Sequence, residues 1–371
     1  MPQQCKLLLD NYAGYYLAGS VIHGRVLFDT DSEIAMRGIR ITLSCNEHTE
    51  WIGTESYYDT TTNEQKSRDT LFTGDKEVTS INQWVYGDQH ASTSLPPGQH
   101  MYQFAFTLPQ NIPGTYRCEK GSIIWKLVAT VDRQMAFDNQ DQMIIVVQSP
   151  VDLNFIARPD DLEPSMYSDE KTVCCWCCAQ GPISMDVELT KRVLVPTEPV
   201  QIKMTLSNMS NTNVEGVSVE LKQIFSYKVD TPNRDDRQDT HILIDLKDVG
   251  LGAHGEHTFL FNVNLPPNVN LPNFAQCGLF SVEYVYKAIA QLPSMHNNLE
   301  VTMHPKVGNI PLGASAIGQS HSQGRLYHPF GEPNPSAPSM DSKEQQGFQG
   351  VPGHFEQPPP TYDSLNTPKR Y

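Results

Sequence analysis

The sequence predicts an all-β protein made of two similar β-sandwiches in tandem, followed by a disordered tail. Three observations predict this class. Apolar residues alternate with polar ones wherever a pattern is present, and no long stretch has the periodicity of an amphipathic helix. The alternating segments are short and end at Gly, Pro and Asn turns, which is typical of immunoglobulin-like sandwiches. A set of these strands and turns recurs in the second half of the chain.

The strand that ends at Leu108 has the clearest pattern in the first half. Its apolar residues Tyr102, Phe104, Phe106 and Leu108 are separated by Gln103, Ala105 and Thr107, and Pro96-Pro97-Gly98 and Pro109 bound it. Such alternation predicts a half-buried strand. The same pattern predicts two further strands, with inward residues Ile39, Ile41 and Leu43, and Ile123, Trp125, Leu127 and Ala129.

The internal repeat is visible as two sets of matching residues, each with one constant sequence spacing. Phe259, Phe261, Val263 and Leu265 repeat the strand at Tyr102–Leu108, while His257, Pro266 and Gly278 repeat His100, Pro109 and Gly121. Earlier in each half the spacing is larger, with Gly216, Val217 and Leu221 matching Gly38, Ile39 and Leu43. The first half therefore has extra residues between Leu43 and His100, and we expect a longer loop between Asp59 and Asp88.

Composition sets the domain boundaries. We expect one sandwich over residues 1–157, a linker rich in Pro, Asp and Glu over 158–180, and a second sandwich over 181–313. Residues 314–371 are rich in Gly, Pro, Ser, Gln and His. Such a segment cannot bury enough apolar area to offset its ordering entropy, so we expect it to be disordered.

Bulk charge and apolar content narrow the functional classes. The formal net charge of −15 argues against a general affinity for nucleic acid or anionic lipid. The first residues do not resemble a signal peptide, and apolar runs such as 143–147 are far too short to span a membrane. We therefore expect a cytoplasmic protein whose eight cysteines stay reduced, and treat the sequon Asn208-Met209-Ser210 as chance.

The ordered set of turns and strands resembles the arrestin family, specifically the α-arrestins, over about residues 5–313. The matching segments are 18–24, 95–100, 104–109, 121–125, 132–133, 174–178, 181–184, 282–284 and 307–312. Thr197-Glu198-Pro199 departs from the glycine usual before the glutamate of the second-half turn. No lysine pair accompanies Lys6 like that of the visual and β-arrestins, so recognition of phosphorylated receptors in their manner is not expected.

The tail contains Pro359-Pro360-Thr361-Tyr362, a ligand for WW domains. Adjacent prolines hold the backbone in a polyproline II helix, which a WW domain receives on aromatic rings, and the tyrosine fills a second pocket. Leu365 can add an apolar contact. The alternative is a proline-rich spacer.

A second tail motif, Pro335-Ser336-Ala337-Pro338, matches the late-domain peptide that the UEV domain of ESCRT-I recognises, and its alternative is chance in a low-complexity tail. The family resemblance implies an adaptor with no cofactor. In this reading the sandwiches engage a membrane receptor or transporter, and the tail recruits a HECT-type ubiquitin ligase for endocytosis and endosomal sorting. The chain would be cytoplasmic, associating only peripherally with plasma membrane and endosomes.

The cluster Cys174, Cys175, Cys177 and Cys178 has three readings: reduced thiols at the start of the second sandwich, which we favour, palmitoylation, or a zinc site. Four ligands within five residues cannot easily surround one ion. The segment His254-Gly255-Glu256-His257 is interpreted as a turn before a strand. No motif indicates catalysis or a metal.

Two other classes of function remain open. One is a structural scaffold of the retromer-associated, arrestin-like type, in which the tail is incidental. The other is a redox-responsive regulator resembling the thioredoxin-interacting branch, acting through Cys277 or the cysteine cluster. For Cys277 the favoured reading is a buried small hydrophobe.

Overall fold

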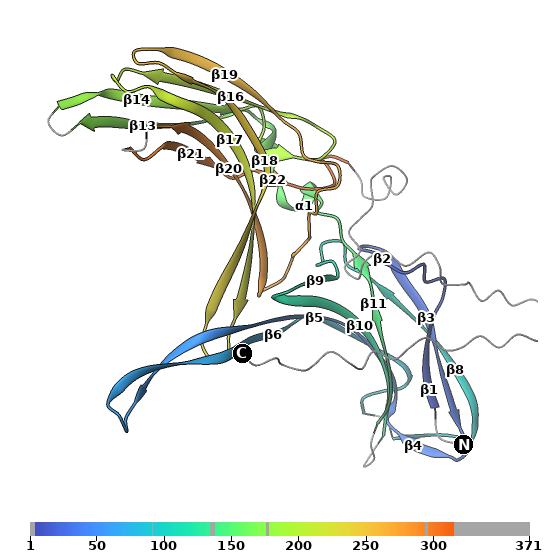
Figure 1. Ribbon diagram of the computed structural model, residues 1–371. Helices are drawn as coiled ribbons and strands as arrows, with labels where there is room; N and C mark the ends of the chain where they lie inside the picture. Colours follow the sequence, from blue (N-terminus) through green and yellow to red (C-terminus); the bar gives the residue numbers. More distant parts are fainter. Residues whose placement is uncertain (1–3, 91, 134–137, 176–177, 294–295, 315–371) are drawn as a thin grey trace, which may run out of the picture. The chain divides into compact units, whose positions relative to one another are not determined.

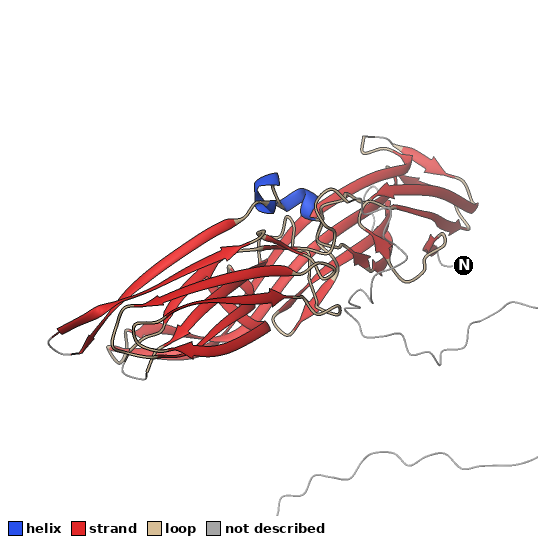
Figure 2. Ribbon diagram, turned by 90° about the horizontal axis from the view of Figure 1, so that it is seen from above, coloured by secondary structure: helices blue, strands red, loops and turns tan. Residues whose placement is uncertain are grey.

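The computed structural model describes residues 4–90, 92–133, 138–175, 178–293 and 296–314. Regular structure in these residues is almost entirely strand (Figure 2). The helical elements among them are the four-residue helix α1 (Leu153–Ile156) and the 3-10 helix η1 (Pro159–Leu162). The all-β prediction is therefore confirmed.

The first sandwich is built from two sheets (Figure 1). One has the order β1-β3-β8, with bounds β1 Gln4–Leu9, β3 Val21–Thr30 and β8 Gly98–Thr107. The other has the order β11-β10-β5-β6, with bounds β11 Asn139–Ile145, β10 Gly121–Asp132, β5 Gly38–Asp59 and β6 Glu64–Gly87, and β9 (Tyr116–Cys118) also pairs with β10. Two short ladders join β2 (Tyr16–Leu17) to β12 (Val147–Gln148) and β4 (Ile34–Met36) to β7 (Thr93–Leu95).

The second sandwich repeats this arrangement. One sheet has the order β13-β14-β16-β19, with bounds β13 Ser165–Cys175, β14 Cys178–Leu189, β16 Val200–Asn208 and β19 Glu256–Val263. The other has the order β18-β17-β20-β21, with bounds β18 Asp235–Leu251, β17 Val214–Val229, β20 Phe280–Gln291 and β21 Leu299–Met303. The parallel pair β15 (Val193–Leu194) with β22 (Lys306–Val307) matches β2 with β12.

The sequence repeat is thus a repeat of topology. In each half a long central hairpin, β5–β6 or β17–β18, joins a third strand, β10 or β20. The predicted strands have the expected faces: Phe104 and Phe106 of β8 are buried, as are Phe259 and Phe261 of β19. Burial of these alternating apolar side chains removes their surface from water and drives the pairing of the sheets.

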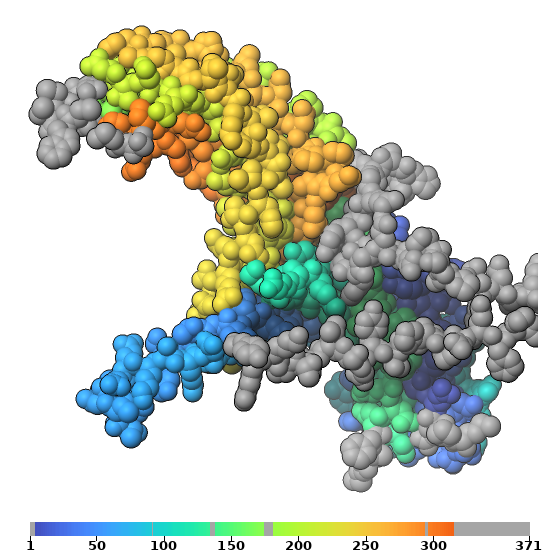
Figure 3. All heavy atoms as spheres, in the orientation of Figure 1, coloured from blue at the N-terminus to red at the C-terminus, as the bar shows by residue number. Residues whose placement is uncertain are grey.

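The longer loop expected between Asp59 and Asp88 is wrong. These residues form β6, and beyond Glu50 strand β5 pairs with β6 alone, from Trp51↔Phe72 to Asp59↔Glu64. The extra residues of the first half therefore lengthen a hairpin, whose blue end projects beyond the other coloured residues in Figure 3. Side chains across the two strands stabilise it, since Lys66 contacts Asp59 at 2.6 Å and Arg68 contacts Glu55 at 2.9 Å. Many positions of this strand are exposed to solvent and hold Thr and Asp, which are residues typical of loops. This composition led to the wrong prediction.

The linker is shorter in the structure than the range 158–180. Strand β13 begins at Ser165 and pairs antiparallel with β14. Its charged residues Asp169, Glu170 and Lys171 suit an edge strand, where polar side chains meet solvent.

Asn208 of the sequon is fully buried and shapes a turn. Its side-chain amide donates to the carbonyls of Thr212 and Gly252, at 2.8 and 3.1 Å. The polar side chain is thereby satisfied inside the second sandwich, and the residue has a structural role there.

Candidate functional site

Both tail motifs lie outside the described residues. The residues Pro335, Ser336, Ala337, Pro338, Pro359, Pro360, Tyr362 and Leu365 belong to 315–371, so their roles stay predictions. The described chain ends at Ala314, whose carbonyl accepts a hydrogen bond from Asn154 Nδ2 at 2.9 Å. The tail therefore begins beside α1, just before the linker between the two sandwiches.

The cysteine cluster lies at the end of the β13–β14 hairpin. The backbone register pairs Cys174 with Ala179 and Cys175 with Cys178. Cys177, with Trp176, lies outside the described residues. The three readings of this cluster stay predictions.

A buried carboxylate, which the sequence analysis did not single out, connects the two sandwiches. Glu47, on β5, is 2% exposed. Its Oε1 accepts a hydrogen bond from the backbone N–H of Gly278 at 2.7 Å, and its Oε2 accepts one from Leu279 N–H at 2.9 Å. Charged acceptors make stronger hydrogen bonds than neutral ones, and these two satisfy a carboxylate that burial would otherwise penalise.

Gly278 allows this close approach. A Cβ at this position would lie 3.0 Å from Lys76 Nζ and 3.3 Å from Glu47 Oε1. The glycine that the sequence repeat singled out therefore lets the backbone of the second sandwich reach the carboxylate. The signal for Glu47 itself is a charged residue at an inward position of a strand, two residues after the buried Cys45.

Hydrogen bonds continue along β5 on one side of Glu47. Thr49 Oγ1 donates to the carbonyl of Lys228 at 2.6 Å, and the indole of Trp51 donates to Asp235 at 3.0 Å. The guanidinium of Arg237 lies 5.1 Å from the Trp51 ring centroid and donates to the carbonyl of Ile52 at 2.9 Å. Cation–π contact adds to the hydrogen bonds here.

Aromatic rings fill the other side of this interface. Tyr116 of the first sandwich lies 4.9 Å from Phe274, 6.0 Å from Phe280 and 6.4 Å from Phe225, measured between ring centroids. Phe225 and Phe280 pack in the same apolar cluster as the core of the first sandwich. One continuous core therefore crosses from one sandwich to the other, and edge-to-face rings add to the apolar burial.

Comparison with known proteins agrees with this architecture. The family model "Arrestin (or S-antigen), N-terminal domain" matches residues 5–154, and "Arrestin (or S-antigen), C-terminal domain" matches residues 179–312. The chain belongs to the α-arrestin family. Arrestin domain-containing protein 4 of Mus musculus is 22% identical over 322 residues, which cover 84% of this chain and 72% of the relative. Arrestin domain-containing protein 1 of Homo sapiens is 24% identical over 356 residues, covering 92% and 72%.

These relatives support an α-arrestin-like adaptor role. The expectation that the chain is not an enzyme stays a prediction. In the described residues, no group of three or more His, Cys, Asp and Glu side chains could hold a metal ion. None of the helices in that part of the α-arrestin has the length and apolar character to span a bilayer.

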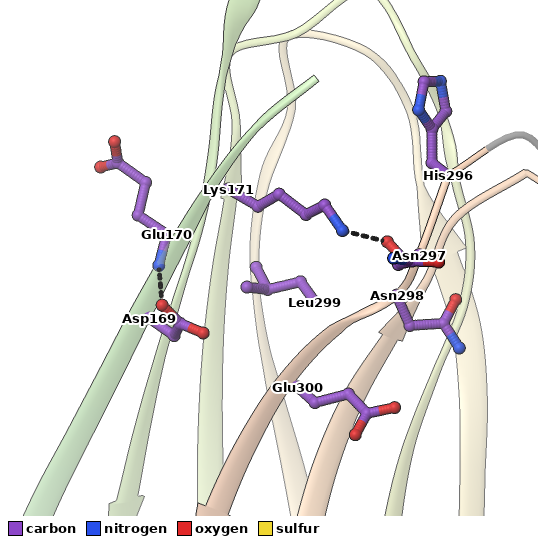
Figure 4. A pocket seen from close by; sticks show the side chains of 8 residues that line it. All are labelled: Asp169, Glu170, Lys171, His296, Asn297, Asn298, Leu299 and Glu300. Carbon is purple, nitrogen blue, oxygen red and sulfur yellow. Dashed lines mark hydrogen bonds between the residues drawn. The ribbon is translucent and has the colours of Figure 1, made fainter. Parts of the chain in front are cut away.

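The α-arrestin has an open polar hollow of about 730 Å³ at one end of the second sandwich (Figure 4). Lys171 of β13 crosses it and donates to the carbonyl of Asn297 at 2.6 Å. Asp169 accepts a hydrogen bond from its neighbour's backbone N–H at 2.8 Å. Acidic, basic and amide side chains share the lining, which differs from the largely apolar pockets that bind small molecules.

Two thiols flank Glu47, the fully buried Cys45 and the partly buried Cys277. Burial raises the pKa of the Cys277 thiol well above its usual range, and the nearby charge of Glu47 raises it further. The pKa of Cys45 is raised for the same two reasons. A raised pKa keeps a thiol protonated and therefore poorly nucleophilic.

Cys5, a third thiol with a raised pKa, allows a direct test of thiol reactivity. Burial, followed by the charge of Asp141, raises its pKa from 9.0 to about 11. Below its pKa a thiol loses tenfold in thiolate for each unit, so at pH 8 alkylation of Cys5 is expected to be about a hundredfold slower than for an unshifted thiol. Iodoacetamide labelling with peptide-resolved mass spectrometry measures this, with the urea-unfolded chain as control. Equal native and unfolded rates would contradict it.

Proposed function

We propose that this α-arrestin is a trafficking adaptor that brings a WW-domain, HECT-type ubiquitin ligase to membrane cargo. The sandwiches engage a receptor or transporter, while Pro359, Pro360 and Tyr362 recruit the ligase. The observation that carries the proposal is a Pro-Pro-x-Tyr sequence behind a complete pair of arrestin sandwiches. Ubiquitination of the cargo then directs endocytosis and endosomal sorting.

The physical contribution of such an adaptor is effective concentration. If the tail is disordered, as the sequence predicts, the chain from Ala314 to Pro359 would have an end-to-end distance of about 40 Å. A ligase held on it meets cargo on the sandwiches at an effective concentration on the order of millimolar, without chemistry from the adaptor. The interface around Glu47 supports this role, because it holds both sandwiches together as one support for the tether.

The motif Pro335-Ser336-Ala337-Pro338 supports a second recruitment step, in which ESCRT-I joins the complex on endosomes. The chain would then be cytoplasmic and reach plasma membrane and endosomes through its partners.

Deleting residues 315–371 distinguishes the proposed adaptor function from the alternative of a structural scaffold. We expect the truncated chain to keep the unfolding temperature of the full chain and its cargo association, and to lose the ligase and the UEV domain in a purified pull-down. A scaffold of the retromer-associated type would keep its partners after the deletion. Retention of both the ligase and the UEV domain would therefore reject the adaptor proposal.

A redox-responsive function through Cys277 has less support. A thiol must ionise to attack a disulfide, and the raised pKa of Cys277 opposes this. A mixed disulfide with thioredoxin that disappears in Cys277→Ser would revive this alternative.

A further inference from the structure

The segment between β12 and β13, which contains α1, η1 and the linker, exposes apolar side chains. Phe155 is 47%, Ile156 41% and Leu162 46% exposed to solvent. On the other face of α1, Leu153 is buried against Val193 and Val195 of the second sandwich. We define the linker strip as Phe155 and Ile156 of α1 with Leu162 of η1. Leu153 anchors α1, and η1 is anchored by the backbone N–H of Arg192, which donates to the carbonyl of Asp161 at 2.7 Å.

The chain leaves the described structure directly beside this strip. Asn154 Oδ1 accepts a hydrogen bond from the backbone N–H of Gly313 at 2.8 Å, and its Nδ2 donates to the carbonyl of Ala314 at 2.9 Å. Leu153 N–H donates to the carbonyl of Ile310 at 3.0 Å. Asn154, the residue before Phe155 in α1, thus holds the start of the tail in place.

We propose that tail residues 325–330 dock on the linker strip of the same chain. This segment reads Arg325-Leu326-Tyr327-His328-Pro329-Phe330 and begins a short distance after Ala314. A flexible chain of that length reaches about 18 Å, so the segment is held at an effective concentration on the order of millimolar. Leu326, Tyr327 and Phe330 supply apolar side chains that would cover those of the linker strip.

Charge favours this occupant over a lipid surface. Of the exposed charged residues here, Asp160 and Glu163 outnumber Arg158, and Asp161 is paired with Arg192 at 3.0 Å, whereas segment 325–330 has Arg325 and no acidic residue. The excess negative charge disfavours an anionic membrane. Apolar contact with a flanking ion pair is the chemistry of a short peptide on a polar-rimmed patch.

Docking would have a consequence for the two tail motifs. Phe330 lies close before Pro335, so the docked segment holds Pro335–Pro338 near the linker and leaves Pro359–Tyr362 on a long free chain. A folded partner at the first motif would then compete with the docked segment, while a WW domain at the second would not.

Hydrogen exchange of the full chain tests the proposal. We expect the amides of 325–330 to exchange about fivefold more slowly than those of a synthetic peptide of the same sequence. The double substitution Phe155→Ser with Ile156→Ser should restore the peptide rate. The matched control, Ile242→Ser with Val249→Ser, alters side chains that are 57% and 73% exposed on β18 and should leave protection unchanged.

Charge reversal adds a second test. Arg325→Glu should reduce protection, and combining it with Glu163→Arg should restore part of it. Peptide-like exchange in the wild-type chain, or protection that survives the linker substitutions, overturns the proposal. Protection that rises with protein concentration also overturns it, because it would identify a second copy as the occupant.

Discussion

Replacing Glu47 by alanine is expected to lower the free energy of unfolding by about 3 kcal/mol. The substitution leaves the buried N–H of Leu279 and the part-buried N–H of Gly278 without their acceptor. An unsatisfied buried donor costs about 1–3 kcal/mol, and the more exposed N–H of Gly278 adds less. Trp51 makes the effect visible, since its indole bonds to Asp235 across the same interface. Urea unfolding followed by tryptophan fluorescence measures the loss.

Two variants sharpen this test. Glu47→Gln keeps one carbonyl oxygen as an acceptor and loses the charge, so we expect a smaller loss than with alanine. Glu256→Ala removes an exposed glutamate at the start of β19 and should change the free energy of unfolding by less than about 0.5 kcal/mol. If Glu47→Ala and Glu256→Ala were equally stable, the carboxylate would not hold the sandwiches together.

Replacing Tyr362 by alanine is expected to weaken binding of the full chain to purified WW domains at least thirtyfold, about 2 kcal/mol. The tyrosine fills its own pocket while the prolines stack on aromatic rings, and a buried aromatic anchor typically contributes this much to a small interface. Calorimetric titration of the full chain with WW domains measures the change. The free energy of unfolding should not change.

The tail provides a matched control. Tyr371→Ala removes another tail tyrosine that has no proline pair before it, and WW affinity should be unchanged. Pro360→Ala should weaken binding as well, since it loosens the polyproline II helix. Undiminished affinity of the Tyr362→Ala chain would reject Pro359–Tyr362 as the WW ligand, and with it the proposed route of ligase recruitment.

Local patterns alone predicted the strands and the duplication. Phe104, Phe106 and their repeats Phe259 and Phe261 could be assigned to buried faces because side chains alternate across a strand with period two. The error over 59–88 has the same origin. A strand is recognised from its sequence by apolar residues at every second position. In the extended hairpin these positions face solvent and are polar, so the segment resembled a loop.

The sequence by itself determined the all-β class, the repeat and the candidate tail ligands, because each depends on neighbours a few residues apart. Only the tertiary structure revealed Glu47 as a partner of Gly278 and Leu279, and Asn154 as the anchor of the tail. These partners are 231, 232 and about 160 residues apart. Which distant backbone groups meet a buried carboxylate depends on how two sandwiches pack, and single-sequence periodicity carries no record of that packing.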